Sequence, residues 1–265
     1  MIKYVHFVLK AIPTLVTKYH KVKKMEKHPE KYSLEERFNT AQDFLRRINK
    51  AAFHCEFIIQ GEENILNEQA IYYANHTSNG DPITFLNIMP RPFAFLAKQE
   101  AMKMVVVGTL AKLVGSQFID REDLRSELKV FKAIDKELTD NPSLSFVVFP
   151  EGTRSKRPDF KLGDFHPGSF KIATRREAPI VPVALFMTDR LLFQKYHYKK
   201  YPIQVRFLKP LYKEDYADMS TKEIADYCKT AIENALIEMR KLDPEYVAEL
   251  NGYSQKKLEK VLYLS

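Results

Sequence analysis

Short apolar segments with strand character alternate with helical segments through the middle of this 265-residue chain. The helical period is clearest at residues 122–139 and at 221–242, where Ser220 and Glu223 open the second stretch with the pattern of a capping box. This alternation favours an α/β fold with a mostly parallel central sheet covered by helices. The segments expected to form strands are 54–60, 70–74, 92–97, 116–119, 144–149, 180–186 and 203–208.

The length favours one large domain with shorter appendages, since a domain takes roughly 150 residues. We expect an N-terminal amphipathic helical segment at 1–50, an α/β domain at 51–242 and a separate C-terminal helical tail at 243–265. No uncharged apolar run approaches the roughly 20 residues that a spanning helix needs. The two cysteines, Cys55 and Cys228, lack both metal-ligand spacing and the density of a disulfide scaffold, so we expect buried thiols in a reducing compartment.

Most of the net charge lies in the N-terminal segment. Residues 1–50 hold 12 Lys or Arg and 5 Asp or Glu, a net of +7 out of +8 for the whole chain. Apolar residues recur at helical spacing from Ile2 to Val16 with Pro13 inside the pattern, and a lysine-rich stretch follows from Lys18 to Lys27. The pairing is typical of a helix lying on an anionic membrane surface. The alternative is a helix docked on its own domain, and charge concentrated in one segment does not favour nucleic acid as a partner.

The first polar junction follows the expected strand at 70–74 and reads Asn-His-Thr-Ser-Asn-Gly-Asp-Pro. On one regular helix His76 and Asp81 would face different sides. If His76 lies in a loop and Asp81 caps the following helix with Pro82 as its first residue, the carboxylate can reach the imidazole. The alternative is that Asp81 is only a helix cap and His76 only a polar loop residue.

The second junction follows the expected strand at 144–149 and reads Phe-Pro-Glu-Gly-Thr-Arg-Ser. Gly152 would let the backbone approach a ligand, Thr153 supplies a hydroxyl, and Arg154 offers a planar donor fork suited to phosphate oxygens. Taken alone, the same residues would also suit a solvated turn.

Together these junctions and two further blocks resemble the glycerolipid acyltransferase family typified by 1-acyl-sn-glycerol-3-phosphate acyltransferase. The resemblance runs from about residue 58 to 186, and four blocks in one order make it specific. The blocks are Asn75 to Ser78 with Asp81, Phe118 to Arg121 preceded by Gly115, Phe149 to Ser155, and Pro179 to Val183.

The resemblance implies transfer of an acyl chain from acyl-CoA or acyl-carrier protein to the free hydroxyl of a lysophosphatidate, forming phosphatidate for phospholipid synthesis. It implies His76 as the general base, because imidazole can remove a proton from the attacking hydroxyl near neutral pH, and Asp81 as the acid that orients it. Another lysolipid or a glycerol phosphate remains open as the acceptor. Neither a cofactor nor a metal is expected, and we expect a peripheral enzyme on the cytoplasmic face of a membrane.

Acceptor binding is implied for the other blocks. Arg121 and Arg154 would pair with phosphate oxygens, and Glu151 would accept from a hydroxyl or fix an arginine. Lys98 stands where family members often carry a basic residue, and Gly152 and Thr153 belong to the same loop as Glu151 and Arg154. Without the family context, Arg121 would form a surface salt bridge and Lys98 would be solvated.

One departure from the family pattern concerns the residue before Asp81. Relatives often carry a bulky apolar residue there, whereas this chain has Gly80, which predicts a looser dyad or a wider entrance. The apolar stretch 104–114 would line an acyl tunnel, face lipid or belong to the core. Two other classes of protein stay open: a metal-assisted phospholipid hydrolase with His76, Asp81 and Glu151 as ligands, and a non-catalytic lipid-binding protein.

Overall fold

A seven-stranded sheet forms the centre of the computed structural model, which describes residues 16–119, 124–155, 161–192 and 198–263. The strand order is β1-β7-β6-β2-β5-β3-β4, and the pairing is parallel except between β6 and β7. The predicted α/β fold with a mostly parallel sheet is therefore confirmed. The strands are β1 Cys55–Gln60, β2 Ile71–Ala74, β3 Phe93–Lys98, β4 Gln117–Ile119, β5 Ser145–Val148, β6 Ile180–Phe186 and β7 Tyr201–Phe207.

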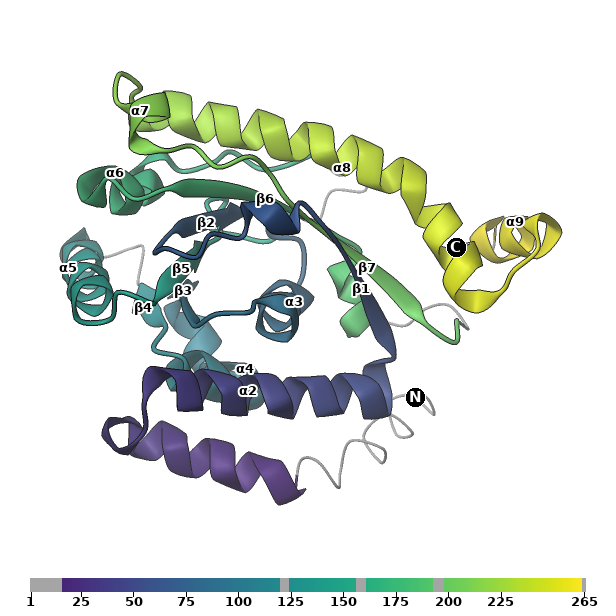
Figure 1. Cartoon of the computed structure of the whole chain (residues 1–265), viewed down its shortest axis with the longest axis horizontal. Helices are drawn as coiled ribbons and strands as arrows, with labels where there is room; N and C mark the ends of the chain where they lie inside the picture. The colour runs from purple at the N-terminus through teal and green to yellow at the C-terminus, as the bar shows by residue number, and fades with distance from the viewer. Residues whose placement is uncertain (1–15, 120–123, 156–160, 193–197, 264–265) are drawn as a thin grey trace.

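Helices cover both faces of the sheet and create two apolar cores (Figure 1). Alternate side chains of a strand point to opposite faces, so Tyr72 belongs to one core and Ile71 and Tyr73 to the other. On the Tyr72 face lie α2 Leu34–Ile48, α3 Gly80–Ile88 and α4 Val105–Leu113; on the opposite face lie α5 Leu124–Asp140, α6 Lys171–Arg176 and most of α8 Thr221–Asn251, whose Val247 belongs to the Tyr72 core. The shorter elements are η1 Pro29–Lys31, η2 Asn49–Phe53, η3 Glu62–Asn64, η4 Gln99–Lys103, η5 Pro167–Phe170, η6 Thr188–Leu191, α7 Lys213–Tyr216 and α9 Gln255–Tyr263.

The described part of the N-terminal segment is packed onto the domain. The helix over residues 16–27 buries Val22 and Met25 in the same core as α2, and the Tyr19 hydroxyl donates to the Val105 carbonyl of α4 at 2.8 Å. The expected stripe from Ile2 to Val16 lies outside the described residues except for Val16 itself, which is 70% exposed. Docking on the domain, the alternative reading of this segment, therefore holds for residues 16–27, and α2 is part of the core rather than an appendage.

The C-terminal helix is longer than the sequence predicts. The expected tail begins at Asp243-Pro244, but α8 runs on through Pro244 to Asn251, and α9 follows. The carboxylate of Asp243 is buried, and the Arg190 guanidinium donates to its two oxygens at 2.7 Å each. This buried contact fixes the C-terminal third of α8 to η6, so the division placed at residue 243 falls inside a helix that belongs to the domain.

Both cysteines are buried free thiols, as expected. Burial raises the pKa of Cys55, and it raises the pKa of Cys228 to about 12. Because the thiolate is the reactive form, neither side chain is a candidate nucleophile. Among the helices of the described ranges, none combines the length and the apolar character needed to cross a bilayer.

Candidate active site

Three loops meet at one edge of the sheet because they follow three neighbouring parallel strands. Strand β2 pairs with β5 on one side and with β6 on the other. The loop after β2 carries His76, the loop after β5 carries Glu151, and Thr188 follows β6. The carboxyl edge of a parallel sheet is the usual position for a site in such folds.

The imidazole of His76 and the carboxylate of Asp81 are in direct contact. His76 Nδ1 lies 2.7 Å from Asp81 Oδ2, and Asp81 is fully buried. The same oxygen accepts from the backbone N–H of Thr77 at 2.7 Å and of Ser78 at 2.9 Å. Helix α3 begins at Gly80 rather than at Pro82, so Asp81 lies in its first turn instead of capping it, but the predicted folding back of the loop is present.

The His76 ring is held between this carboxylate and an aromatic surface. It stacks on Phe149, with ring centroids 4.3 Å apart and planes 21° apart, and Phe149 in turn packs on Phe95. Because Nδ1 is engaged by Asp81, Nε2 is the nitrogen available for proton transfer. The side chain of His76 is 20% exposed and lines a cavity, so a substrate in the cavity can reach the ring.

Glu151 lies beside the dyad with its carboxylate buried. One oxygen accepts from the backbone N–H of His76 at 2.7 Å, and the other accepts from the Gly163 N–H at 2.8 Å and from the Ser155 hydroxyl. These bonds link the loop after β2 to the loop after β5. The expected contact of Glu151 with the acceptor stays a prediction, and none of these three donors is an arginine.

The structure describes three of the remaining predicted site residues in full. Gly152 adopts a left-handed φ of 65°, which favours glycine, and lines the cavity with Thr153 and Arg154. The Arg154 guanidinium donates to Asn79 Oδ1 at 3.0 Å and is exposed. Lys98 ends β3, but its side chain lies outside the described part of the structure, and Arg121 lies outside the described residues.

Gly80 has a different role from the one predicted. A Cβ at this position would lie 2.1 Å from the Thr188 carbonyl oxygen, so any larger residue would push the two loops apart. Gly80 is buried and is not among the residues that line the cavity. It neither loosens the dyad nor widens the entrance; it allows the loop after β6 to approach α3.

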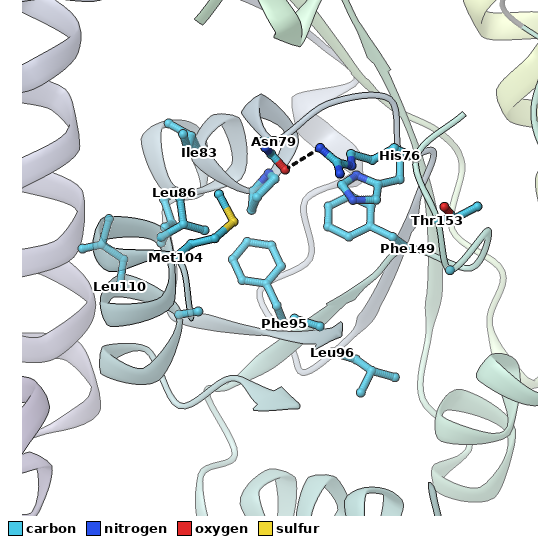
Figure 2. Close-up of a pocket in the computed structure, with 16 residues that line it drawn as sticks. His76, Asn79, Ile83, Leu86, Phe95, Leu96, Met104, Leu110, Phe149 and Thr153 are labelled. Atoms are coloured by element: carbon cyan, nitrogen blue, oxygen red, sulfur yellow. Dashed lines mark hydrogen bonds between the residues drawn. The ribbon is translucent and has the colours of Figure 1, made fainter. Parts of the chain in front are cut away.

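A cavity of about 400 Å³ joins the dyad to an apolar interior. Figure 2 shows His76 and Thr153 toward one side and Leu86, Met104 and Leu110 toward the other. The stretch 104–114 therefore contributes to cavity, core and surface: Met104 and Leu110 line the cavity, Leu113 and Val114 are buried in the core, and Val105 is 75% exposed. A volume of this size lies within the roughly 300–1,000 Å³ typical of small-molecule sites.

Two contacts at the site were not expected from the sequence. Thr188 donates its hydroxyl hydrogen to Asp81, and Asn75 exchanges hydrogen bonds with the Leu185 backbone at 3.0 and 2.8 Å. The order of strands, with β6 beside β2, would have indicated the loop after 180–186 as a neighbour of His76. In the ranges that the structure describes, no three His, Cys, Asp or Glu side chains gather as a metal site.

Comparisons with known proteins point to an acyltransferase, in agreement with the fold and the site described above. Residues 56–186 match the family model described as Acyltransferase, so this part of the chain is similar to that family. The chain resembles the 1-acyl-sn-glycerol-3-phosphate acyltransferases of Saccharomyces cerevisiae, with 29% identity over 68% of this chain, and of Cocos nucifera, with 32% identity over 60%. The matches span 60% and 51% of those relatives' lengths.

The fold also resembles a solved structure. The crystal structure of the 1-acyl-sn-glycerophosphate acyltransferase PlsC from Thermotoga maritima superposes with a TM-score of 0.64 at 22% identity. The match covers 90% of this chain and 98% of that one. It supports the α/β fold described above.

Proposed function

We propose that this protein transfers an acyl chain from the thioester of acyl-CoA or acyl-carrier protein to the free hydroxyl of a lysophosphatidate, forming phosphatidate. The observation that carries the proposal is the 2.7 Å contact of His76 with Asp81 at the polar side of a largely apolar cavity. The named activity of the relatives supports lysophosphatidate as the acceptor. An acyl chain suits the apolar lining, and the ester-forming groups would lie next to the imidazole.

The mechanism needs one base and no covalent enzyme intermediate. Nε2 of His76 takes the proton of the acceptor hydroxyl as the hydroxyl oxygen attacks the thioester carbonyl carbon. The tetrahedral oxyanion then collapses, the carbon–sulfur bond breaks, and the leaving thiolate takes the proton back from the imidazolium. Asp81 keeps Nδ1 protonated and offsets the positive charge that the ring carries between the two proton transfers.

Arg154 is the described group best placed to receive the acceptor phosphate. It is exposed, lines the cavity near His76, and is oriented by Asn79. An arginine can give two parallel hydrogen bonds to phosphate oxygens, which fixes orientation as well as charge. Arg121 and Lys98 remain proposed partners of the same phosphate on the strength of the family resemblance.

The protein acts at a membrane surface, on the cytoplasmic side, as a peripheral enzyme. Exposed apolar side chains gather near the cavity: Met102 and Met104 are 37% and 36% exposed, and Val105 is 75% exposed. The N-terminal helix contacts Val105 through Tyr19 and exposes Lys21, Lys24 and Lys27. Apolar side chains beside lysines suit the boundary between acyl chains and anionic headgroups.

The test is thiol release from acyl-CoA by the purified full chain with lysophosphatidate, in excess chelator, with phosphatidate identified as the product. We expect His76→Ala to lower kcat by about a hundred- to ten-thousand-fold, the usual contribution of a general base. His28→Ala is the matched control, because His28 is an exposed histidine that precedes η1. A panel with glycerol 3-phosphate and other lysolipids, and with acyl-carrier protein as donor, defines both substrates.

Two results would contradict the proposal. If His76→Ala keeps more than about a tenth of the rate, His76 is not the base. If chelation abolishes the reaction and zinc restores it, the chemistry is metal-assisted and the dyad has another role.

A further inference from the structure

Both oxygens of the Asp81 carboxylate accept hydrogen bonds. Its Oδ2 accepts from His76 and from the backbone of Thr77 and Ser78, as described above. Its Oδ1 accepts from the hydroxyl of Thr188, which is 0% exposed. A buried carboxylate oxygen without a hydrogen-bond donor would destabilise the protein. Thr188 supplies the donor that Oδ1 needs.

Several features bring Thr188 to this position from 107 residues away in the sequence. The two hydrogen bonds between Asn75 and Leu185 fix the end of β2 to the end of β6. Met187 then turns the chain with a left-handed φ of 59°. The absence of a side chain on Gly80 leaves room for the Thr188 carbonyl against α3.

The direction of the hydrogen bonds follows from the charge of Asp81. An ionised carboxylate can only accept, so the single hydroxyl hydrogen of Thr188 points to Asp81. The Thr188 oxygen, 2.9 Å from Ser78 Oγ, must then accept from the Ser78 hydroxyl. Ser78 Oγ in turn accepts from the backbone N–H of Gly80 at 2.9 Å. The result is a one-way chain from Gly80 through Ser78 and Thr188 to Asp81.

We infer that Thr188 is a positioning residue of the dyad, which acts on the imidazole through Asp81. It holds the carboxylate in the orientation in which Oδ2 receives the Nδ1 hydrogen of His76, so that Nε2 stays free to accept a proton. This inference rests on the proposed function for its effect on turnover. Its effect on the imidazole does not depend on the substrate, because the contacts among Thr188, Asp81 and His76 are present in the protein alone.

Two substitutions distinguish the positioning of Asp81 by the Thr188 hydroxyl from a merely structural role of the Thr188 side chain. Thr188→Val keeps the shape of the side chain and removes the hydroxyl, whereas Thr188→Ser keeps the hydroxyl and removes a methyl group. The matched control is Thr84→Val, since Thr84 is also 0% exposed, lies in α3 three residues after Asp81, and has no hydrogen-bond partner for its hydroxyl within the described ranges.

The experiment compares the three variants in the acyl-CoA and lysophosphatidate assay. A hydrogen bond to a charged group predicts that Thr188→Val lowers kcat by about 10- to 100-fold with KM for both substrates unchanged. The kcat of Thr188→Ser should stay within about threefold of the wild-type value, and the kcat of Thr84→Val should equal the wild-type value. NMR of isotope-labelled imidazole nitrogens, with the His76 signals assigned by His76→Gln, should show the Nδ1–H form in the wild type and a mixture of forms in Thr188→Val.

Three results would overturn the inference. They are a wild-type kcat in Thr188→Val, a loss of kcat in Thr188→Ser as large as that in Thr188→Val, and His76 ring signals that are the same in Thr188→Val and the wild type. If the wild type transfers no acyl group to any acceptor, the proposed function fails, and the ring signals alone decide the role of Thr188. Should Thr188→Val not fold, Thr188→Cys takes its place as a side chain of similar size with a weak donor.

Discussion

At the scale of single residues, the site depends on buried acceptors that bind backbone groups as well as side chains. Asp81 accepts from Thr77 and Ser78, and Glu151 accepts from the backbone of His76. Each carboxylate thus fixes the loop that carries the imidazole from a different side. His76, the proposed base, is therefore positioned at its backbone by Glu151 and at its ring by Asp81.

We predict that Glu151→Gln destabilises the fold. The amide group of glutamine would face donors that now meet a carboxylate oxygen, and leaving a buried donor unsatisfied costs about 1–3 kcal/mol. The free energy of unfolding, measured in urea, should fall by this amount, while Glu63→Gln at an exposed position should leave it unchanged. A raised KM for the acceptor with unchanged stability would show instead that Glu151 contacts the acceptor, as the family resemblance implies.

The sequence identifies the residues of the dyad but not the residues that hold it in place. His76 and Asp81 stand five positions apart in a block with family resemblance, so their contact could be predicted. Thr188 could not, because a lone threonine after a strand carries no pattern, and its role depends on which strands are neighbours. Gly80 was misread for the same reason: the atom that requires a glycine there belongs to Thr188.

At the scale of elements, α8 holds the loop that reaches the dyad. Asp243 lies in the last third of α8, and its two oxygens pair with Arg190 of η6, the element that Thr188 begins. Arg190 also donates to the Pro202 carbonyl of β7 at 2.8 Å. The long helix on the far face of the sheet is thereby connected to the carboxyl edge where the site lies.

We predict that Asp243→Asn lowers the free energy of unfolding by about 3–5 kcal/mol, because it leaves the guanidinium of Arg190, only 3% exposed, without its counter-charge. The double variant Arg190→Met with Asp243→Leu should recover most of the loss, since it removes both charges. Urea unfolding measures both. Asp226→Asn, which breaks the exposed pair with Lys222, is the control and should have little effect. Equal losses in the single and double variants would mean that packing rather than charge governs the contact.

The elements themselves could largely be predicted, and the exceptions have physical causes. All seven expected strands are present, and the fully buried ones, such as β2 and β5, show the apolar runs typical of a parallel sheet. The end of α8 was misplaced because proline usually stops a helix, whereas Pro244 is accommodated inside this one. That β7 runs antiparallel to β6 could not be predicted, because no local pattern within the two strands encodes their relative direction.

At the scale of the whole molecule, charge and cavity are arranged on one side of the sheet. The N-terminal helix packs beside α2 and α4, while α8 lies across the opposite face (Figure 1). The cavity is bounded by α3 and α4, so its apolar lining lies on the same side as the lysines of residues 16–27. A membrane on that side would meet basic and apolar groups together.

We predict that the triple variant Lys21→Gln, Lys24→Gln and Lys27→Gln weakens binding to anionic vesicles by roughly a hundredfold, since each basic residue near such a surface contributes about 1 kcal/mol. Cosedimentation of the full chain with vesicles of phosphatidylcholine and phosphatidylserine measures the loss of binding, which should shrink as salt is raised.

Removal of residues 1–28 is a poor test of the same prediction, because it would take Val22 and Met25 out of the core. The matched control neutralises three exposed lysines of α7 and α8, namely Lys213, Lys222 and Lys241. If both triple variants lose binding equally, attraction is spread over the whole surface and the N-terminal helix does not orient the enzyme.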